Sequence, residues 1–121
     1  MWSRFFAVLF AVVILPAVVV ADTQDGKWSK LDGTYMLYGG SLDEMTPPSA
    51  SDTKLSVFIN GRLAKDLFTR MGRADRRQCA DDIATRMRGA LSCTKTIKTG
   101  EVECSFGFDV LQGKAIAGSV C

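Results

Sequence analysis

The chain opens with the longest apolar run in its sequence. Residues 5–20 are all apolar, Arg4 precedes them, and small residues end the run before the polar segment that starts at Asp22. A charged start, an apolar core and a small-residue end are typical of a signal peptide. We therefore expect residues 1–21 to be a signal peptide that is cleaved after Ala21.

The alternative interpretation of this run is an uncleaved membrane anchor. The run holds 16 residues, which is fewer than the roughly 20 that a helix needs to cross the hydrocarbon core, and Pro16 would kink such a helix. No cysteine stands directly after Ala21 to accept a lipid. We therefore expect the protein to contact a membrane only through its signal peptide, before cleavage.

The pattern after the signal peptide predicts a polar lead and then one domain. Residues 22–32 are mostly polar and form the N-terminal lead, and residues 33–121 are expected to fold as a single domain. Two segments in the first half of this domain are rich in β-forming residues and predict strands, over residues 34–38 and 55–59. The apolar side chains that share one face of the second strand are Leu55, Val57 and Ile59.

A helical period indicates one confident helix, over residues 61–71. The apolar side chains on its predicted buried face are Leu63, Leu67, Phe68 and Met71. Asn60 precedes this segment and can cap its first turn, and Gly72 follows where a C-terminal cap residue belongs. The polar residues 73–82 then predict a loop or a short helical turn.

Strand patterns return from Thr85 to the end of the chain. The clearest strand covers residues 102–109, where apolar and polar side chains alternate. Residues 91–96 are its expected hairpin partner, and a last hairpin is expected to return through residues 114–121.

The predicted fold class is therefore α+β. We expect an antiparallel sheet of about five to six strands, one main amphipathic helix packed on it, and two disulfides. The alternation in the strand at 102–109 places Phe106 and Phe108 in the core.

Four cysteines after a signal peptide indicate two disulfides. Cys93 and Cys104 are equally distant from the turn at 98–99, so an unbulged hairpin places them directly opposite each other. Cys79 is then expected to pair with Cys121. A one-residue bulge at Gly100 would shift this register, and the other two pairings, or a metal site built from four thiolates, then stay open.

The sequence contains no histidine, which excludes the common histidine-dependent nucleophiles and metal sites. With all cysteines paired, we expect no catalytic residue, no metal and no cofactor. The remaining candidates for chemistry are two pairs of adjacent acids in polar segments, Asp43 with Glu44 and Asp81 with Asp82. Solvated carboxylates are the simpler interpretation of both pairs.

Charge is distributed unevenly along the chain. Residues 22–53 carry six acids and two lysines, whereas residues 61–88 carry eight bases and four acids. Such a basic region can dock an envelope protein or an anionic envelope polymer, and its candidate binding residues are Arg70, Arg73, Arg76 and Arg77. The alternative is a solvated face that balances the acidic N-terminal part. Nucleic acid is not an expected partner, because the net charge without the signal peptide is close to zero.

The two tyrosines add one more candidate for binding. Tyr35 and Tyr38 fall on opposite faces of their predicted strand, so we expect one in the core and one at the surface. Tyr38 stands beside the turn at Gly39 and Gly40 and is the candidate binding residue of the two.

Several segments of the domain are similar to segments of a known group of proteins. They are residues 63–68 before Met71 and Gly72, the spacing of Cys79 and Cys93, residues 104–109, and residues 113–121. Together they resemble uncharacterised small exported proteins of Gram-negative bacteria with four cysteines. The resemblance spans most of residues 22–121 and implies a periplasmic or secreted location, but it implies no activity and no site residues.

The function expected from these features is that of a non-catalytic binding protein of the bacterial envelope. An inhibitor or immunity protein against a cell-wall-degrading enzyme would fit the small size and the two disulfides. Two alternatives stay open, a small hydrolase that uses the adjacent acids and a structural envelope protein without a discrete ligand.

Overall fold

The protein is described by a computed structural model that covers residues 11–17, 26–73 and 75–121. The expected cleavage site after Ala21 lies outside these residues. Residues 11–17, part of the predicted signal peptide, carry exposed side chains and have no regular secondary structure. No helix within the described ranges is long and apolar enough to cross a membrane.

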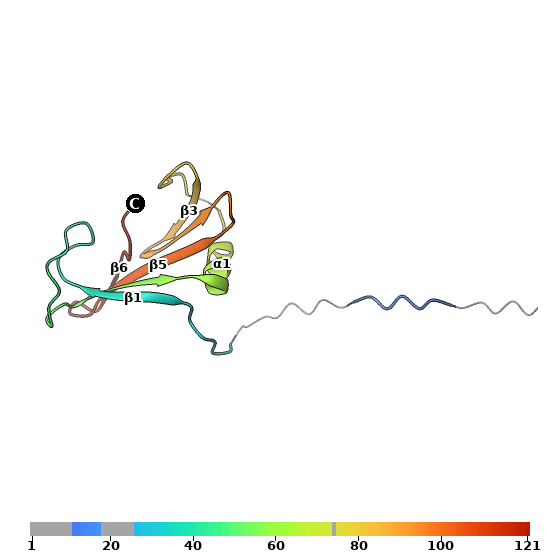
Figure 1. The fold of residues 1–121 in the computed structure, drawn as a ribbon, viewed down its shortest axis with the longest axis horizontal. Helices are drawn as coiled ribbons and strands as arrows, with labels where there is room; N and C mark the ends of the chain where they lie inside the picture. The colour runs from blue at the N-terminus through green and yellow to red at the C-terminus, as the bar shows by residue number, and fades with distance from the viewer. Residues whose placement is uncertain (1–10, 18–25, 74) are drawn as a thin grey trace, which may run out of the picture.

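Six antiparallel strands form one sheet, as the sequence predicts (Figure 1). In chain order the strands are β1 (Gly33–Tyr38), β2 (Lys54–Ile59), β3 (Ile83–Arg88), β4 (Leu91–Thr96), β5 (Val102–Asp109) and β6 (Lys114–Ile116). Across the sheet the order is β1-β2-β5-β4-β3. The short β6 pairs with the second half of β5, on the edge of β5 that β4 occupies along its first half.

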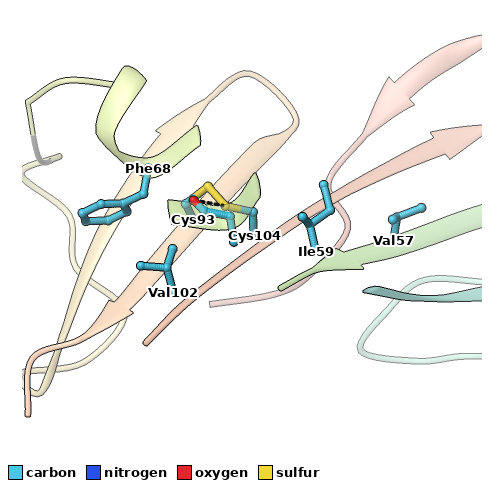
Figure 2. Close-up of a cluster of buried hydrophobic side chains, with 7 residues drawn as sticks. Val57, Ile59, Phe68, Cys93, Val102 and Cys104 are labelled. Atoms are coloured by element: carbon cyan, nitrogen blue, oxygen red, sulfur yellow. Dashed lines mark hydrogen bonds between the residues drawn. A yellow bond between two sulfur atoms is a disulfide. The ribbon is translucent and has the colours of Figure 1, made fainter. Parts of the chain in front are cut away.

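One helix in the described ranges, α1 (Gly61–Arg70), packs over β5 and β4 at one end of the sheet (Figure 1). Its buried residues are Ala64 and Phe68, which contact the cluster of Val57, Ile59, Cys93, Val102 and Cys104 (Figure 2). Leu63 was expected in this core but is 41% exposed, because it faces the N-terminal lead instead of the sheet.

The sequence predicted the C-terminal end of α1 correctly, but not the side-chain cap at its N-terminal end. Asn60 is the N-cap residue, but its side chain makes no capping hydrogen bond. The backbone N–H of Asn60 instead donates to the carbonyl oxygen of Asp32, at 2.8 Å. Gly72 follows the helix with φ of +75°, the left-handed conformation that a glycine at this position provides.

Both predicted disulfides are present. Cys93 lies directly opposite Cys104 in the register of β4 and β5, with a Cα separation of 4.0 Å, so no bulge intervenes. Both residues are buried beneath α1 (Figure 2). The other bridge joins Cys79, in the loop before β3, to Cys121.

The last segment of the chain differs from the expected strand, because β6 ends at Ile116. Residues 117–121 leave the sheet edge and cross the face opposite to α1. The hydroxyl of Ser56 donates to the carbonyl oxygen of Gly118 at 2.6 Å, and the hydroxyls of Ser105 and Ser119 lie 2.7 Å apart. A Cβ atom on Gly118 would lie 2.4 Å from the backbone of Phe106, so only glycine permits this close crossing.

Candidate functional site

At one end of the sheet polar side chains are buried and apolar side chains are exposed, the opposite of the usual pattern. In the first half of β5, which pairs with β4, Val102 and Cys104 are buried, as their apolar character predicts. Further along the same strand Ser105 and Asp109 are buried, whereas Phe108 is 39% exposed and Phe106 only half-buried. The expectation that both phenylalanines belong to the core is therefore wrong for Phe108.

The physical reason for this reversal is the position of the covering segments. A helix of ten residues is about 15 Å long, whereas a strand of eight residues is about 27 Å long, so α1 covers only part of one face. Residues 117–121 cover the other face and bury its serines. On this apolar face Val57 and Ile59 are buried in the core cluster, whereas β1, the start of β2 and the second half of β5 have no covering element among the described residues.

The side chains of this face form two rows across three strands, and Val57 is the buried member of the first row. In the strand register, Tyr35 lies opposite Val57, which lies opposite Phe106; in the next row the order is Leu37, Leu55 and Phe108. Tyr35 is 75% and Leu37 54% exposed. We name the open face by its five least protected residues: Tyr35, Leu37, Leu55, Phe106 and Phe108. None of the five carries a charge, and together they make a contiguous apolar surface of the kind that marks interaction sites.

Tyr38 does not belong to the surface, which corrects its assignment as a binding residue. It lies on the same face as Ser56 and Asp109 and is only 5% exposed, so Tyr35 is the exposed tyrosine of the pair. Burial raises the pKa of the Tyr38 phenol, and the negative charge of Asp109 raises it further. Both effects favour the neutral phenol.

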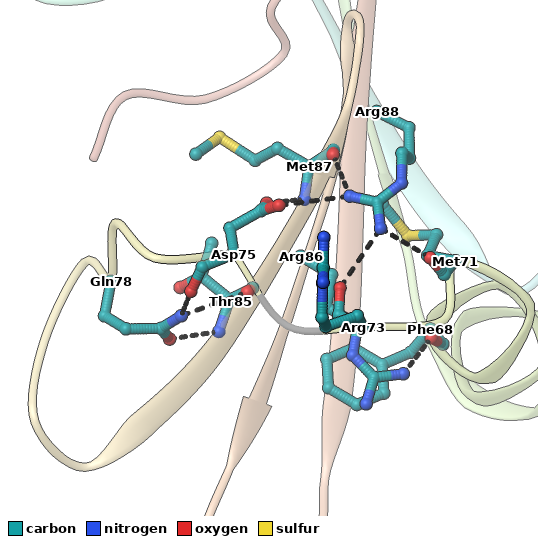
Figure 3. A network of polar contacts seen from close by, with 9 residues as sticks. All are labelled: Phe68, Met71, Arg73, Asp75, Gln78, Thr85, Arg86, Met87 and Arg88. Atoms are coloured by element: carbon teal, nitrogen blue, oxygen red, sulfur yellow. Dashed lines mark hydrogen bonds and ion pairs between the residues drawn. The ribbon is translucent and has the colours of Figure 1, made fainter.

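The basic region divides into arginines that hold the fold together and arginines that face solvent. Arg88 donates from Nη2 to the carbonyl oxygens of Met71 and Arg73, at 2.7 and 3.1 Å, and its Nη1 pairs with Asp75 at 3.1 Å (Figure 3). Arg86 donates to the carbonyl oxygen of Phe68 at 2.6 Å and lies 4.0 Å above the phenyl ring. These two side chains satisfy carbonyl groups at the end of α1.

The four candidate arginines are all exposed. Arg70 ends α1, and the loop between α1 and β3 carries Arg73, Arg76 and Arg77. The strand order therefore places the three loop arginines on the β3 side of the sheet, whereas the open face lies on the β1 side. Arg70 instead lines the groove between the N-terminal lead and α1. The loop arginines and the open face are separate surfaces.

The two acid pairs lie near opposite edges of the sheet. Asp43 and Glu44 follow β1, and Asp81 and Asp82 precede β3, so the two pairs do not meet. The Ser41 hydroxyl donates to Asp43 at 2.7 Å and lowers the pKa of that carboxyl group, with a further contribution from a backbone hydrogen bond. A general acid at neutral pH needs a raised pKa, so the hydrogen bond favours the wrong protonation state. The described residues contain no group of three or more potential metal ligands.

The described surface also carries grooves, of which two bear on the candidate site. The larger, of about 680 Å³, lies between the N-terminal lead and α1. Side chains of both charges line it, among them Lys27, Lys30, Asp32, Arg62 and Asp66. The smaller, of about 330 Å³, lies beside the Cys79–Cys121 bridge.

No protein-family model, curated protein or solved structure matches this chain. The resemblance to exported four-cysteine proteins thus stays a prediction, and the candidate surface is defined by its geometry alone.

Sequence reasoning missed the open face because alternating apolar side chains are the normal signal of a buried strand face. Tyr35 and Leu37 share that pattern with Val57 and Ile59, which are buried. A comparison of the area that one short helix can cover with the apolar area of the whole predicted sheet would have indicated an uncovered face, because the helix is too small to cover all of it.

Proposed function

We propose that this protein is an exported, non-catalytic binding protein of the bacterial envelope that docks a partner protein on its open face. The observation that supports the proposal is the exposure of Tyr35, Leu37 and Phe108 in two rows across three paired strands. Aromatic side chains are enriched at the energetic centres of protein interfaces. Their position on a sheet fixes their geometry before binding, which reduces the entropic cost of association.

The chemistry of the open face favours a protein over an anionic polymer as the partner. Its five side chains are apolar or aromatic and uncharged, so they complement another apolar surface and offer no ionic contact to phosphates or carboxylates. An inhibitor or immunity protein against a cell-wall-degrading enzyme fits this description, because such a protein acts by presenting a rigid surface.

The two disulfides are consistent with an oxidising, exported compartment. Within it, we propose the periplasm as the location. The bridges also make the platform behind the open face rigid, because Cys104 is in β5, the strand that carries Phe106 and Phe108.

The test compares two surfaces of one protein. The full chain is expressed and exported with a photo-crosslinking amino acid at Tyr35, at Phe108 or, as the control, at Arg76. We expect the same adduct, of a defined mass other than that of two copies of this chain, from the first two positions and none from Arg76. The same adduct should disappear when Leu37→Thr is added to the Phe108 cross-linker. An adduct that forms at Arg76 alone would overturn the proposal in favour of docking through the arginines.

A second measurement tests the proposed class of partner. The purified protein is added to peptidoglycan together with a purified cell-wall-degrading enzyme, and the rate of hydrolysis is followed. Inhibition should be lost in Phe108→Thr and retained when Arg76→Gln and Arg77→Gln are combined. Inhibition that depends on the arginines and not on Phe108 would contradict the proposal.

A further inference from the structure

The two outer edges of the sheet are built differently. The outward backbone groups in the second half of β3 are those of Thr85 and Met87, and side chains of the preceding loop satisfy three of them (Figure 3). Gln78 accepts from the Thr85 N–H at 2.6 Å and donates to the Thr85 carbonyl oxygen at 3.3 Å, and Asp75 accepts from the Met87 N–H. This edge is therefore closed to another strand.

The β1 edge has no such cover among the described residues. The hydrogen bond from the Asn60 N–H to the Asp32 carbonyl shows that even-numbered residues of β1 pair with β2. The N–H and carbonyl groups of Gly33, Tyr35 and Leu37 therefore point outward, and no other strand pairs with that edge.

The residues of β1 also lack the usual protection of an edge strand. Its sequence, residues 33–38, contains no charged residue and no proline, whereas β3 carries Arg86 and Arg88. Native proteins normally protect an exposed edge with charges, proline, bulges or a covering segment, because it otherwise pairs with another chain. The β1 edge is unprotected, whereas the opposite edge, β3, is covered by loop side chains and carries two arginines. This contrast favours the interpretation that β1 is paired with another strand when the protein functions.

We propose that β1 pairs antiparallel with β1 of a second copy of this chain, around a twofold axis at Met36. This register sets Tyr35 against Leu37 of the second copy, an aromatic and aliphatic pair that stabilises antiparallel sheets. Both residues have outward backbone groups, so each can exchange two hydrogen bonds with the other. The symmetric pairing is self-complementary, as a twofold interface requires.

Charge on either side of β1 favours a second copy over an unrelated strand. Lys27, Lys30 and Asp32 precede β1 and leave residues 26–32 with a net positive charge, and Asp43 and Glu44 follow β1. Antiparallel pairing brings the segment before β1 of one copy toward the segment after β1 of the other, so opposite charges approach at both ends of the interface. A twofold axis perpendicular to the sheet also puts both open faces on one side, where they form one continuous surface.

The first test measures the mass of the exported chain by sedimentation equilibrium. We expect the mass of two copies, reduced to that of one copy by Tyr35→Pro, which removes an outward N–H and leaves the bonds to β2 intact. The matched control Tyr35→Thr keeps that N–H and should remain a dimer. Circular dichroism establishes that the proline variant is folded. A single-copy mass for the unaltered chain would overturn the proposal.

The second test fixes the register by cysteine cross-linking. Met36→Cys should give a covalent dimer on a non-reducing gel, because the axis places position 36 against itself. Thr34→Cys, on the same strand and the same face, lies opposite Tyr38 of the second copy and should not cross-link. Equal cross-linking at both positions would refute this register.

The dimer and the proposed docking of a partner are separable. Phe108 lies on β5, away from the β1 edge, so Phe108→Thr should abolish partner binding and leave the two-copy mass unchanged. Tyr35→Pro should halve the mass whether or not a partner protein exists.

Discussion

The two halves of this sheet use the same alternation of side chains with opposite results. In the closed half, made of β3, β4, the first part of β5 and α1, apolar side chains are buried around the Cys93–Cys104 bridge, together with Val57 and Ile59 from β2. In the open half, made of β1, β2, β6 and the rest of β5, Tyr35 and Phe108 face solvent, while Ser56 and Ser105 are buried. A covering segment, and not the character of the strand itself, decides which face is protected.

This difference separates stability from binding. The closed half contains both the buried bridge and the arginines that hold the end of α1, so changes there should reduce the free energy of unfolding. The exposed side chains of the open face, such as Tyr35, Leu37 and Phe108, contribute little buried area, so changes there should affect binding and leave stability nearly unchanged. The five predictions that follow test this separation.

The largest effect is expected from the buried bridge. Replacing Cys93 and Cys104 together by alanine removes a closed loop worth about 3 kcal/mol in the chain-entropy model and leaves a cavity beneath α1, for a total loss of about 4 kcal/mol. Urea unfolding of the variant and the unaltered protein measures the loss. A loss below about 1 kcal/mol would show that the closed half does not depend on its bridge.

The next effect concerns the reverse side of the open half. Gly118→Ala forces a Cβ atom into the backbone of Phe106 and should cost about 2 kcal/mol, as overpacking does elsewhere. Val120→Ala, in the same segment but with an exposed side chain, is the matched control and should change stability very little. Similar melting temperatures for the two variants would mean that the crossing is not tight.

A smaller loss is expected at the end of α1. Arg88→Met removes the hydrogen bonds to Met71 and Arg73 and the pair with Asp75, and because Arg88 is partly exposed the loss should be about 1 kcal/mol. Arg77→Met removes a charge from the neighbouring loop and serves as the control. If both variants lose the same stability in thermal unfolding, then net charge and not the contacts of Arg88 is responsible.

Tyr38 gives the open half a pH dependence at high pH. Its raised pKa means that the folded state holds the phenol proton more tightly than the unfolded state does. The resulting stability is fully present below about pH 10, the unfolded value, and is lost as the pH rises through the folded pKa. Melts from about pH 8 to about pH 11 should show a steeper decline for Tyr35→Phe than for Tyr38→Phe. Parallel curves would contradict this expectation.

The smallest change in stability is expected on the open face itself. Tyr35→Thr keeps a β-forming residue at an exposed position and should shift the free energy of unfolding by less than about 0.5 kcal/mol, although it removes a side chain that we assign to binding. Urea unfolding at several protein concentrations measures the shift. A loss above about 2 kcal/mol would place Tyr35 in the core of the molecule and remove the distinction between the halves.

Local patterns predicted most of the fold. The spacing of Cys93 and Cys104 about one turn fixed the hairpin and one bridge, and elimination then gave the other. The helix followed from its apolar period and from Gly72. Each of these features depends on residues close together in the sequence, or on a cysteine count, and such information is readable without coordinates.

The candidate site could not be predicted in the same way, because exposure depends on segments far apart in the chain. The turn next to Tyr38 predicted an exposed side chain. In the register of the sheet, however, Tyr38 lies on the same face as Ser56 and Asp109, where it is buried. Arg86 and Arg88 belong to the basic region of the sequence, but in the structure their guanidinium groups donate hydrogen bonds to carbonyl oxygens at the end of α1. Neither outcome has a local signal.

The strand order also has a kinetic consequence. Ile59 pairs with Cys104 and Lys54 with Asp109, so the contact between β2 and β5 joins residues that are 45 to 55 positions apart. The hairpin of β1 with β2 and the three-stranded unit of β3, β4 and β5 close much shorter loops and should assemble earlier during folding. We expect the pairing of these two units along β2 and β5 to limit the folding rate. Chains that have not yet reached this step would expose the unpaired edges of both units to the chaperones of the cell.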